Sequence, residues 1–207
     1  MKEELRKQLY AHFRGADRLR EYYERLDAQI NQTANHYNLH CKQNCGACCM
    51  GHAESKEATP FEMLPLAIEL EVTGKADQYL ERLENEDCAD ITCVGFVNVD
   101  ESKGWGHCGV YTLRPFVCRL FGDSLYHTKG DQTEYTGCKW LKEQYEKNPH
   151  KKELHDELPG MAETALEGRD IDEEEEEFGE IMDINDALKT ALEQVRMKHH
   201  LLEGKLE

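Results

Sequence analysis

Four of the nine cysteines in this chain of 207 residues fall within nine consecutive positions. They occur in the stretch Cys41-Lys-Gln-Asn-Cys45-Gly-Ala-Cys48-Cys49. If this stretch is helical, steps of about 100° place the four thiols within an arc of about 100° on one side. If it is a turn, the spacing of Cys45 and Cys48 suits one metal ion, and Gly46 lets the backbone close around it. Four neighbouring thiolates would repel one another, so the stretch predicts a cation among them.

The other cysteines are spread more widely. Cys93, Cys108, Cys118 and Cys138 each fall where a strand, helix or turn is expected to end, so each side chain can point toward a shared site. Taken singly, each would be interpreted as a small buried hydrophobic residue. Cys88 lies in an acidic stretch without a motif, and we expect it to be a free or structural thiol.

The composition indicates the cellular compartment of the protein. At 39% hydrophobic residues it is long enough to form a core without disulfide bonds. It has neither a basic leader followed by an apolar segment nor a run of about 18 apolar residues. We therefore expect a cytoplasmic protein that is not secreted and does not span a membrane. In a reducing cytoplasm thiols stay unpaired, which favours metal binding or catalysis over disulfide bonds.

The charge of the chain is negative and unevenly distributed. The net charge is −17, and residues 150–186 alone carry fifteen acidic against three basic residues. Residues 1–40 carry seven basic and six acidic residues, so no basic patch is available for phosphates and we expect no binding to nucleic acid. Seven of the eight residues in 170–177 are acidic, and their repulsion predicts a solvated linker.

Apolar or small residues alternate at spacings of four and three from Leu5 to Tyr37. This pattern predicts one long amphipathic helix. His12 and Thr33 interrupt the apolar stripe. Such a stripe can pack on the helix's own domain or form an intermolecular coiled coil, and the sequence favours neither. The oligomeric state therefore stays open.

A second helix is predicted over residues 60–73. Thr59 is a suitable N-cap, Pro60 suits the first turn, and Glu62 completes the pattern of a capping box. Gly74 is expected to end the helix.

A short β-hairpin is predicted beyond this helix. Residues 91–99 are rich in β-branched side chains, residues 100–106 resemble a turn, and residues 107–111 resume the strand composition. Because Pro115 excludes a central strand, residues 114–119 are expected to form a turn into a short helix.

A last amphipathic helix is predicted from apolar residues at helical spacing, namely Ile181, Ile184, Leu188, Ala191, Val195 and Leu202. The expected fold is α+β and mainly helical, with a long N-terminal helix, a small β-hairpin, a cysteine-rich metal-centred core and a C-terminal helix. The expected divisions are an N-terminal amphipathic helix (1–40), a cysteine-cluster metal-binding domain (41–148), an acidic connector (149–180) and the C-terminal helix (181–207).

The first three cysteines, spaced CxxxCxxC, also match the motif that holds a cluster in radical S-adenosylmethionine enzymes. That motif belongs after the first strand of a large α/β barrel. Here it follows a long predicted helix, and too few strand-like segments remain for a barrel. We therefore do not favour this interpretation.

The early cluster and the later segment from Cys93 to Phe121 together resemble the CxxCxxCC family of zinc- or iron-chelating proteins, which includes the YkgJ-type cysteine cluster proteins. The resemblance covers about residues 41–140, with both halves of the motif in order. It implies an eight-cysteine metal centre. For one branch, which resembles the flagellin lysine N-methylase, it also implies S-adenosylmethionine-dependent methylation of protein lysines.

The expected metal ligands are therefore Cys41, Cys45, Cys48, Cys49, Cys93, Cys108, Cys118 and Cys138. Zinc and iron–sulfur clusters both accept four thiolates, so the ligands do not choose between them. Eight thiols can fill two four-ligand sites or fewer.

Several residues beside the cysteines are weaker candidates. His52 and His107 neighbour cysteines and are candidate ligands or hydrogen-bond donors to ligands. Arg114 and Arg119 flank Cys118, where they can stabilise thiolates, bind an anionic substrate group or form ion pairs within this acidic chain.

Three functions are compatible with these patterns. The one we favour is a metal-binding protein of unknown substrate, whose centre is structural or sensory. The second is an iron–sulfur enzyme for redox work or protein modification. The third is a zinc-stabilised scaffold whose acidic segment recruits a basic protein partner.

Overall fold

Helices account for most of the structure, and short antiparallel strand pairs lie between them, so the chain is mainly helical α+β as predicted. The computed structural model describes residues 1–42, 45–50, 56–84, 92–100, 105–130, 132–169 and 179–204. Within these ranges the helices are α1 (Lys2–His12), α2 (Ala16–Tyr37), α3 (Ala47–Met50), α4 (Pro60–Thr73), α5 (Ala76–Glu84), α7 (Phe116–Leu120), α8 (Lys139–Lys147), α9 (Lys151–Glu157), α10 (Met161–Arg169) and α11 (Ile184–Leu202), with a 3₁₀ turn at Tyr111–Leu113. The strands are β1 (Glu57–Ala58), β2 (Phe96–Asp100), β3 (Trp105–Cys108), β4 (Leu125–His127), β5 (Thr133–Tyr135) and β6 (Met182–Asp183). Over the same ranges, none of the helices combines the length and the hydropathy that crossing a membrane requires.

In the part of the chain that the structure describes, the strands form three antiparallel pairs, of which the sequence predicted one. The predicted hairpin is β2–β3, in which Phe96 lies opposite Cys108 and Val97 opposite His107. β4 pairs with β5 in a second hairpin, and β1 pairs with β6. The last two pairs were missed because strands of two or three residues are too short to show an alternating pattern.

The N-terminal region contains two helices where one was expected. α1 ends at His12, and α2 begins after Gly15, whose φ of 77° lies in the left-handed region that glycine adopts without strain. The long helix is thus α2, and the chain turns between the two. Leu9 and Leu19 on either side of the turn are fully buried in the chain's own core. In this structure the apolar stripe of α1 and α2 therefore packs on the core of the same chain.

The predicted start and end of α4 are confirmed. The Thr59 hydroxyl accepts a hydrogen bond from the backbone N–H of Glu62 at 3.2 Å, and the Glu62 carboxylate accepts one from the Thr59 N–H, also at 3.2 Å. Gly74 ends the helix in the left-handed conformation, with φ 78°. Local residue types are enough to fix both ends of this helix.

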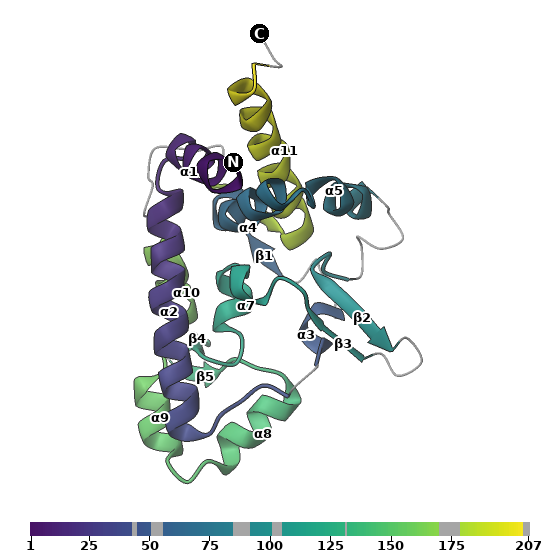
Figure 1. Ribbon diagram of the computed structural model, residues 1–207. Coiled ribbons are helices and arrows are strands. Elements are labelled where there is room, and N and C mark those ends of the chain that lie inside the picture. Colours follow the sequence, from purple (N-terminus) through teal and green to yellow (C-terminus); the bar gives the residue numbers. More distant parts are fainter. Residues whose placement is uncertain are drawn as a thin grey trace.

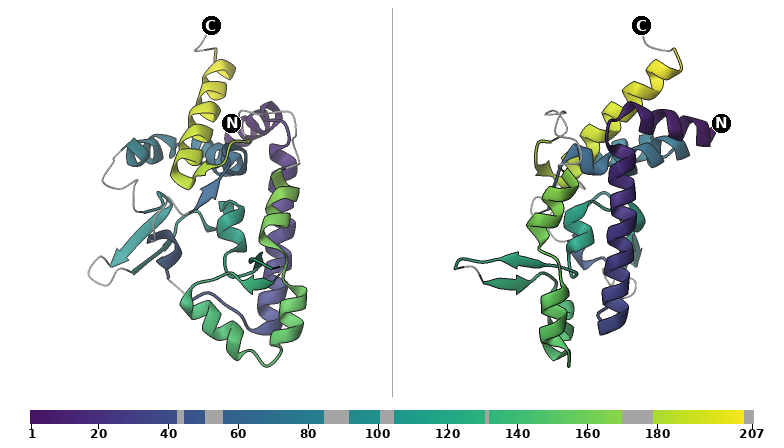
Figure 2. Two further views of the ribbon diagram at one scale, coloured as in Figure 1. Left: turned by 180° about the vertical axis from the view of Figure 1, so that it is seen from behind. Right: turned by 90° about the vertical axis from the view of Figure 1, so that its left-hand side faces the viewer.

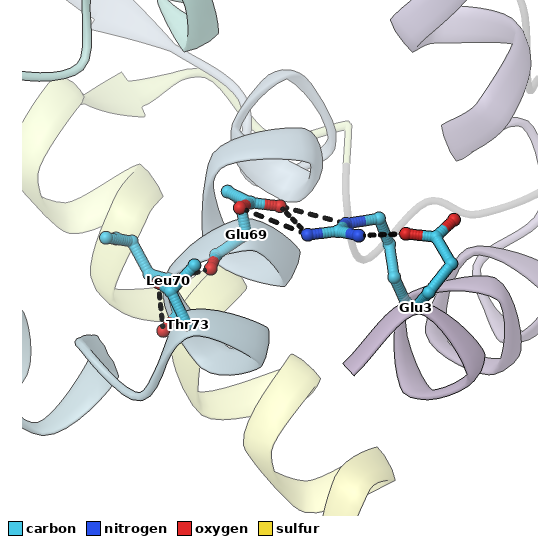
Figure 3. Close-up of polar contacts among 5 residues, drawn as sticks. Glu3, Glu69, Leu70 and Thr73 are labelled. Carbon is cyan, nitrogen blue, oxygen red and sulfur yellow. Dashed lines mark hydrogen bonds and ion pairs between the residues drawn. The ribbon is translucent and has the colours of Figure 1, made fainter. Parts of the chain in front are cut away.

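A larger core surrounds α4 at one end of the molecule, where α1, α4, α5 and α11 gather (Figure 1). The predicted C-terminal helix is confirmed as α11, which packs along α4 through residues that include Leu188 and Val195. Arg6 of α1 donates two hydrogen bonds to the carboxylate of Glu69 in α4, at 3.0 and 3.2 Å, and so links the two helices (Figure 3).

A smaller core lies at the other end, where α8 and α9 pack against the end of α2 (Figure 2). Its buried residues are Tyr37, Leu39, Leu125, Tyr135, Leu141, Tyr145, Leu154 and Leu158. α2 extends from one core to the other, so it holds the two ends of the molecule at a fixed separation (Figure 2).

The region expected as an acidic connector contains two packed helices, α9 and α10. Leu154 of α9 is fully buried in the smaller core. In α10, Gly168 approaches Phe116 so closely that a Cβ there would lie 1.9 Å from its ring. Packing of apolar and small residues therefore holds these helices against the rest of the molecule despite their acidic residues. The most acidic segment, residues 170–177, lies outside the described residues.

A buried carboxylate ties together three helices of the larger core. Glu62 is fully buried, and its carboxylate accepts hydrogen bonds from Arg169 of α10 at 2.7 Å and from the backbone N–H of Phe116 in α7 at 3.1 Å. The ion pair with Arg169 offsets the cost of burying the charge.

Replacing Glu62 with glutamine should therefore lower the free energy of unfolding by about 2 kcal/mol, as measured in urea. This is less than the roughly 3–5 kcal/mol that breaking a fully buried pair costs, because Arg169 keeps contact with solvent. The matched control is Glu146→Gln, which removes an exposed ion pair with Lys151 and should change stability little. Equal effects of the two substitutions would contradict the role assigned to Glu62.

Candidate metal centre

Two of the clustered cysteines lie on α3, a single turn that packs against the β2–β3 hairpin. The turn forms because the backbone N–H groups of Cys49 and Met50 both bond to the carbonyl of Gly46, at 2.8 and 3.0 Å. Gly46 is required for the packing, since a Cβ there would lie 2.1 Å from the ring of Phe96 in β2. α3, which carries Cys48 and Cys49, therefore lies beside the β2–β3 hairpin (Figure 1).

Backbone hydrogen bonds bring Cys93 and Cys108 to the same place. The N–H of Cys93 donates to the carbonyl of Cys49 at 3.0 Å, which joins the start of the hairpin to α3. Cys108 ends β3, opposite Phe96, and the N–H of Gly109 donates to the carbonyl of Gly95 at 2.8 Å. The hairpin thus carries one cysteine at the base of each strand, beside α3.

Cys49 stands at the centre of these thiols. Its side chain has those of Cys108, Cys48 and Cys93 as hydrogen-bond partners, and these bonds raise the pKa of Cys49 far above its ordinary value. The same bonds lower the pKa of Cys48 to about 6 and of Cys108 to about 7, and they lower that of Cys93. One S–H proton can serve only one acceptor at a time, so the three thiolates compete for it.

Other groups also favour the thiolate form of these residues. The backbone N–H groups of Gly95 and Val110 donate to the sulfurs of Cys93 and Cys108, each from two residues further along the chain. Hydrogen bonds to ligand sulfurs are the usual outer support of a thiolate metal site. The local backbone therefore favours the anionic form of these two sulfurs.

Two cations add to this effect. Arg114 lowers the pKa of Cys48 and Cys108, and Lys56 lowers that of Cys48 and Cys93. Arg114 is fixed by hydrogen bonds to the carbonyls of Tyr111 at 2.7 Å and Cys118 at 3.1 Å. Of the roles considered for Arg114, stabilising thiolates is thus the one its position supports. Lys56 was missed, because a single lysine seven residues after the cysteine cluster carries no sequence signal.

Cys118 approaches the same group from α7. It packs against the larger core, and burial raises the pKa of its thiol, with the neighbouring thiolate of Cys93 as a further cause. Arg114 opposes this rise. Cys118 thus borders the group of thiols around Cys49 but stays protonated in the absence of a metal.

Cys41, Cys45 and Cys138 gather at the start of α8. Cys138 is the N-cap residue of α8, and Cys41 follows the end of α2. Burial, and then the negative charges of Cys45, Cys48 and Cys138, raise the pKa of Cys41 to about 11. The eight cysteines predicted as ligands therefore lie in one neighbourhood, in which Cys48 bonds to Cys49 and its charge also acts on Cys41. Cys88 lies outside the described residues.

The other residues considered as site candidates are Arg119, His107 and His52, and none of them is placed among the thiols by the described structure. Arg119 is fully buried and serves the fold, since it pairs with Asp27, donates to two backbone carbonyls and stacks on the ring of Tyr23. His107 is exposed and lies one residue before Cys108 on β3, so it points to the opposite face of the hairpin. His52 lies outside the described residues.

The thiols are close together but are not arranged as a finished coordination shell. Among the described residues, no three histidine, cysteine, aspartate or glutamate side chains stand where they could hold a metal ion without moving. The donor set nevertheless fits such an ion chemically, because soft thiolates supported by N–H groups and cations bind zinc and iron well. Side-chain rotation around Cys49 would have to complete the shell.

Comparison with known proteins identifies one family. Residues 40–151, more than half of the chain, match the model of the CxxCxxCC family, described as a "Putative zinc- or iron-chelating domain". The matched segment contains all eight cysteines of the neighbourhood described above. No curated protein and no solved structure matches the chain significantly.

The difference between Cys41 and Cys48 can be measured in the metal-free protein. Both are exposed, yet the pKa is about 11 for Cys41 and about 6 for Cys48. Because the thiolate is the reactive form, iodoacetamide at pH 7 should alkylate Cys48 much faster than Cys41. The rate at Cys48 should rise with pH through about 6 and then level off, as followed by peptide mapping. Equal rates at the two residues would show that the described hydrogen bond from Cys49 is not formed.

Proposed function

The chain belongs to the CxxCxxCC family of zinc- or iron-chelating domains, and from this we propose that it is a cytoplasmic metal-binding protein whose clustered cysteines hold zinc or an iron–sulfur cluster. The residues that would hold the metal are Cys41, Cys45, Cys48, Cys49, Cys93, Cys108, Cys118 and Cys138. A cytoplasmic site is supported by the cysteines themselves, since all eight are free thiols despite their proximity.

The observation that carries the proposal is the crowding of cysteine side chains around Cys49. The side chains of Cys108, Cys48 and Cys93 all bond to the one S–H group of Cys49, which can donate to only one acceptor at a time. Buried or half-buried thiolates of like charge raise one another's energy. A metal ion in place of that proton would turn crowded sulfurs around Cys49 into ligands, and bound metal deprotonates the remaining thiol.

The surrounding charges also match a thiolate centre. Four thiolates around Zn²⁺, or around a cluster core of charge 2+, leave a formal charge of about −2. Among the described residues, Arg114 and Lys56 are cations that act on these thiolates. They would offset the remaining charge, which explains why two cations lie beside the centre in so acidic a chain.

When bound, zinc would cross-link the segments that carry its ligands, whereas an iron–sulfur cluster would also accept and donate electrons. The chain's own contribution is to bring those segments together. α3, the hairpin and α7 supply sulfurs from residues that are as much as 70 positions apart in the sequence, from Cys48 to Cys118. The metal should therefore stabilise the folded chain as well as fill the site.

Metal analysis of protein purified without oxygen tests the proposal and distinguishes the two metals. Bound iron with acid-labile sulfide and visible absorption would indicate a cluster, and zinc in a colourless protein would indicate a zinc site. A folded protein that contains neither metal would contradict the proposal.

Substituting the central thiol should have a large effect. Cys49→Ser should lower the amount of bound metal and the melting temperature, because the serine hydroxyl is a poor ligand and stays protonated. Cys88→Ser is the matched control, since Cys88 was not assigned as a ligand, and it should keep both metal content and melting behaviour. If Cys49→Ser keeps the full metal content of the wild type, Cys49 is not a ligand.

The role of Arg114 can be separated from the ligands. Arg114→Gln should weaken metal binding by about tenfold, in line with the loss of an outer partner of a metal ligand. Arg114→Lys should recover part of the affinity because it keeps the positive charge. Competition against a chelator of known affinity gives both values, and identical values for glutamine and lysine would exclude a role for the charge.

A further inference from the structure

We propose that the eight cysteines form two neighbouring metal sites and that one of them exchanges its metal with solvent. The inner site consists of Cys49, Cys93, Cys108 and Cys118, and the outer site of Cys41, Cys45, Cys48 and Cys138. Each site would take a divalent ion that prefers thiolates, such as zinc or ferrous iron. The inference rests on the proposed metal binding, but it makes a separate claim about how the thiols are divided.

The division begins at the adjacent residues Cys48 and Cys49. Successive side chains on a helical turn point about 100° apart, so these two sulfurs leave α3 in different directions. Cys49 is buried, whereas Cys48 is exposed. One turn of helix thus directs one thiol inward and the other outward, and the hydrogen bond between them marks where the two sites touch.

The inner site is defined by contacts on the inward side. The N–H of Cys93 bonds to the carbonyl of Cys49, and the pairing of Phe96 with Cys108 places the two hairpin cysteines side by side. Cys118 joins them because it and Cys93 both pack against the larger core. None of these four cysteines is exposed.

The outer site is defined by how the chain leaves α2. Asn148 donates to the carbonyl of Tyr37 at 2.7 Å, and Gln144 donates to the carbonyl of His40 at 3.0 Å. Residues 37–40 therefore run antiparallel to α8, toward its N-terminal end. The next residue, Cys41, is directed toward Cys138, the N-cap of that helix.

The N-terminal end of α8 also suits a thiolate site. Unpaired N–H groups at the start of a helix favour negative charge nearby. Cys138 packs against the smaller core, whereas Cys93 and Cys118 pack against the larger one. The two sites thus belong to different cores and meet at α3.

Exposure should make the two sites behave differently. In the outer site Cys41 and Cys48 are exposed, and Cys45 and Cys138 are half-buried. A competing chelator can approach a metal held there and displace its ligands one at a time. A metal in the inner site is enclosed by α3, the hairpin and α7, so release would require these segments to separate. The outer site is therefore suited to the transfer of metal and the inner site to its retention.

The adjacent cysteines provide a matched pair of variants for the test. The full-length protein is loaded with zinc and mixed with excess 4-(2-pyridylazo)resorcinol, whose colour reports released zinc. The wild type should carry two zinc ions per chain and release them in a fast and a slow phase. Cys48→Ser should abolish the fast phase and keep one slowly released ion, whereas Cys49→Ser should abolish the slow phase.

Cys138→Ser provides a second outer variant and should behave like Cys48→Ser, which keeps the test decisive if Cys49→Ser does not fold. A wild type with one zinc ion, or a single release phase, would overturn the division into two sites while leaving metal binding intact. Loss of both ions in Cys48→Ser and Cys138→Ser would overturn it as well. A wild type that binds no zinc and no iron would instead refute the proposed function itself.

Discussion

Mutual repulsion among crowded thiolates is the constraint on which the centre of this molecule depends. The sulfurs of Cys48, Cys93 and Cys108 lie close enough to compete for the proton of Cys49. Backbone N–H groups from Gly95 and Val110 and the cations of Arg114 and Lys56 reduce this repulsion without removing it. A bound metal would turn the same crowding into attraction, because each sulfur would then be a ligand.

This constraint explains the position of the cysteines between two hydrophobic cores. The larger core around α4 and the smaller core around α8 are joined by α2 and by the segments that carry the thiols. Cys93 and Cys118 border the first core, and Cys138 borders the second. Metal binding would therefore add a link between the two hydrophobic cores.

Local features of the fold could be predicted from the sequence, and long-range ones could not. The ends of α4 follow from Thr59, Glu62 and Gly74, which lie in or beside the helix itself. The break before α2 was missed, because the apolar stripe continues across Gly15 and periodicity does not report a turn in the backbone. The pairing of β1 with β6 joins residues more than 120 positions apart and leaves no pattern in either strand.

The candidate site shows the same division. Clustering in the sequence identified Cys41 to Cys49, and resemblance to the family added the later cysteines as expected ligands. The chemical difference between Cys48 and Cys49 follows from the direction in which α3 presents each side chain, which depends on Gly46 packing against Phe96. Lys56 and the N–H donors could not be found from the sequence, since only the folded chain brings them to the sulfurs.

X-ray absorption at the edge of the bound metal tests the central claim most directly, because it reports the atoms in contact with the metal. An all-cysteine centre predicts four sulfur neighbours per metal at about 2.3 Å and no nitrogen or oxygen ligand. A shell in which nitrogen or oxygen atoms at about 2.0–2.1 Å replace most of the sulfurs would contradict the assignment of the cysteines as the ligands.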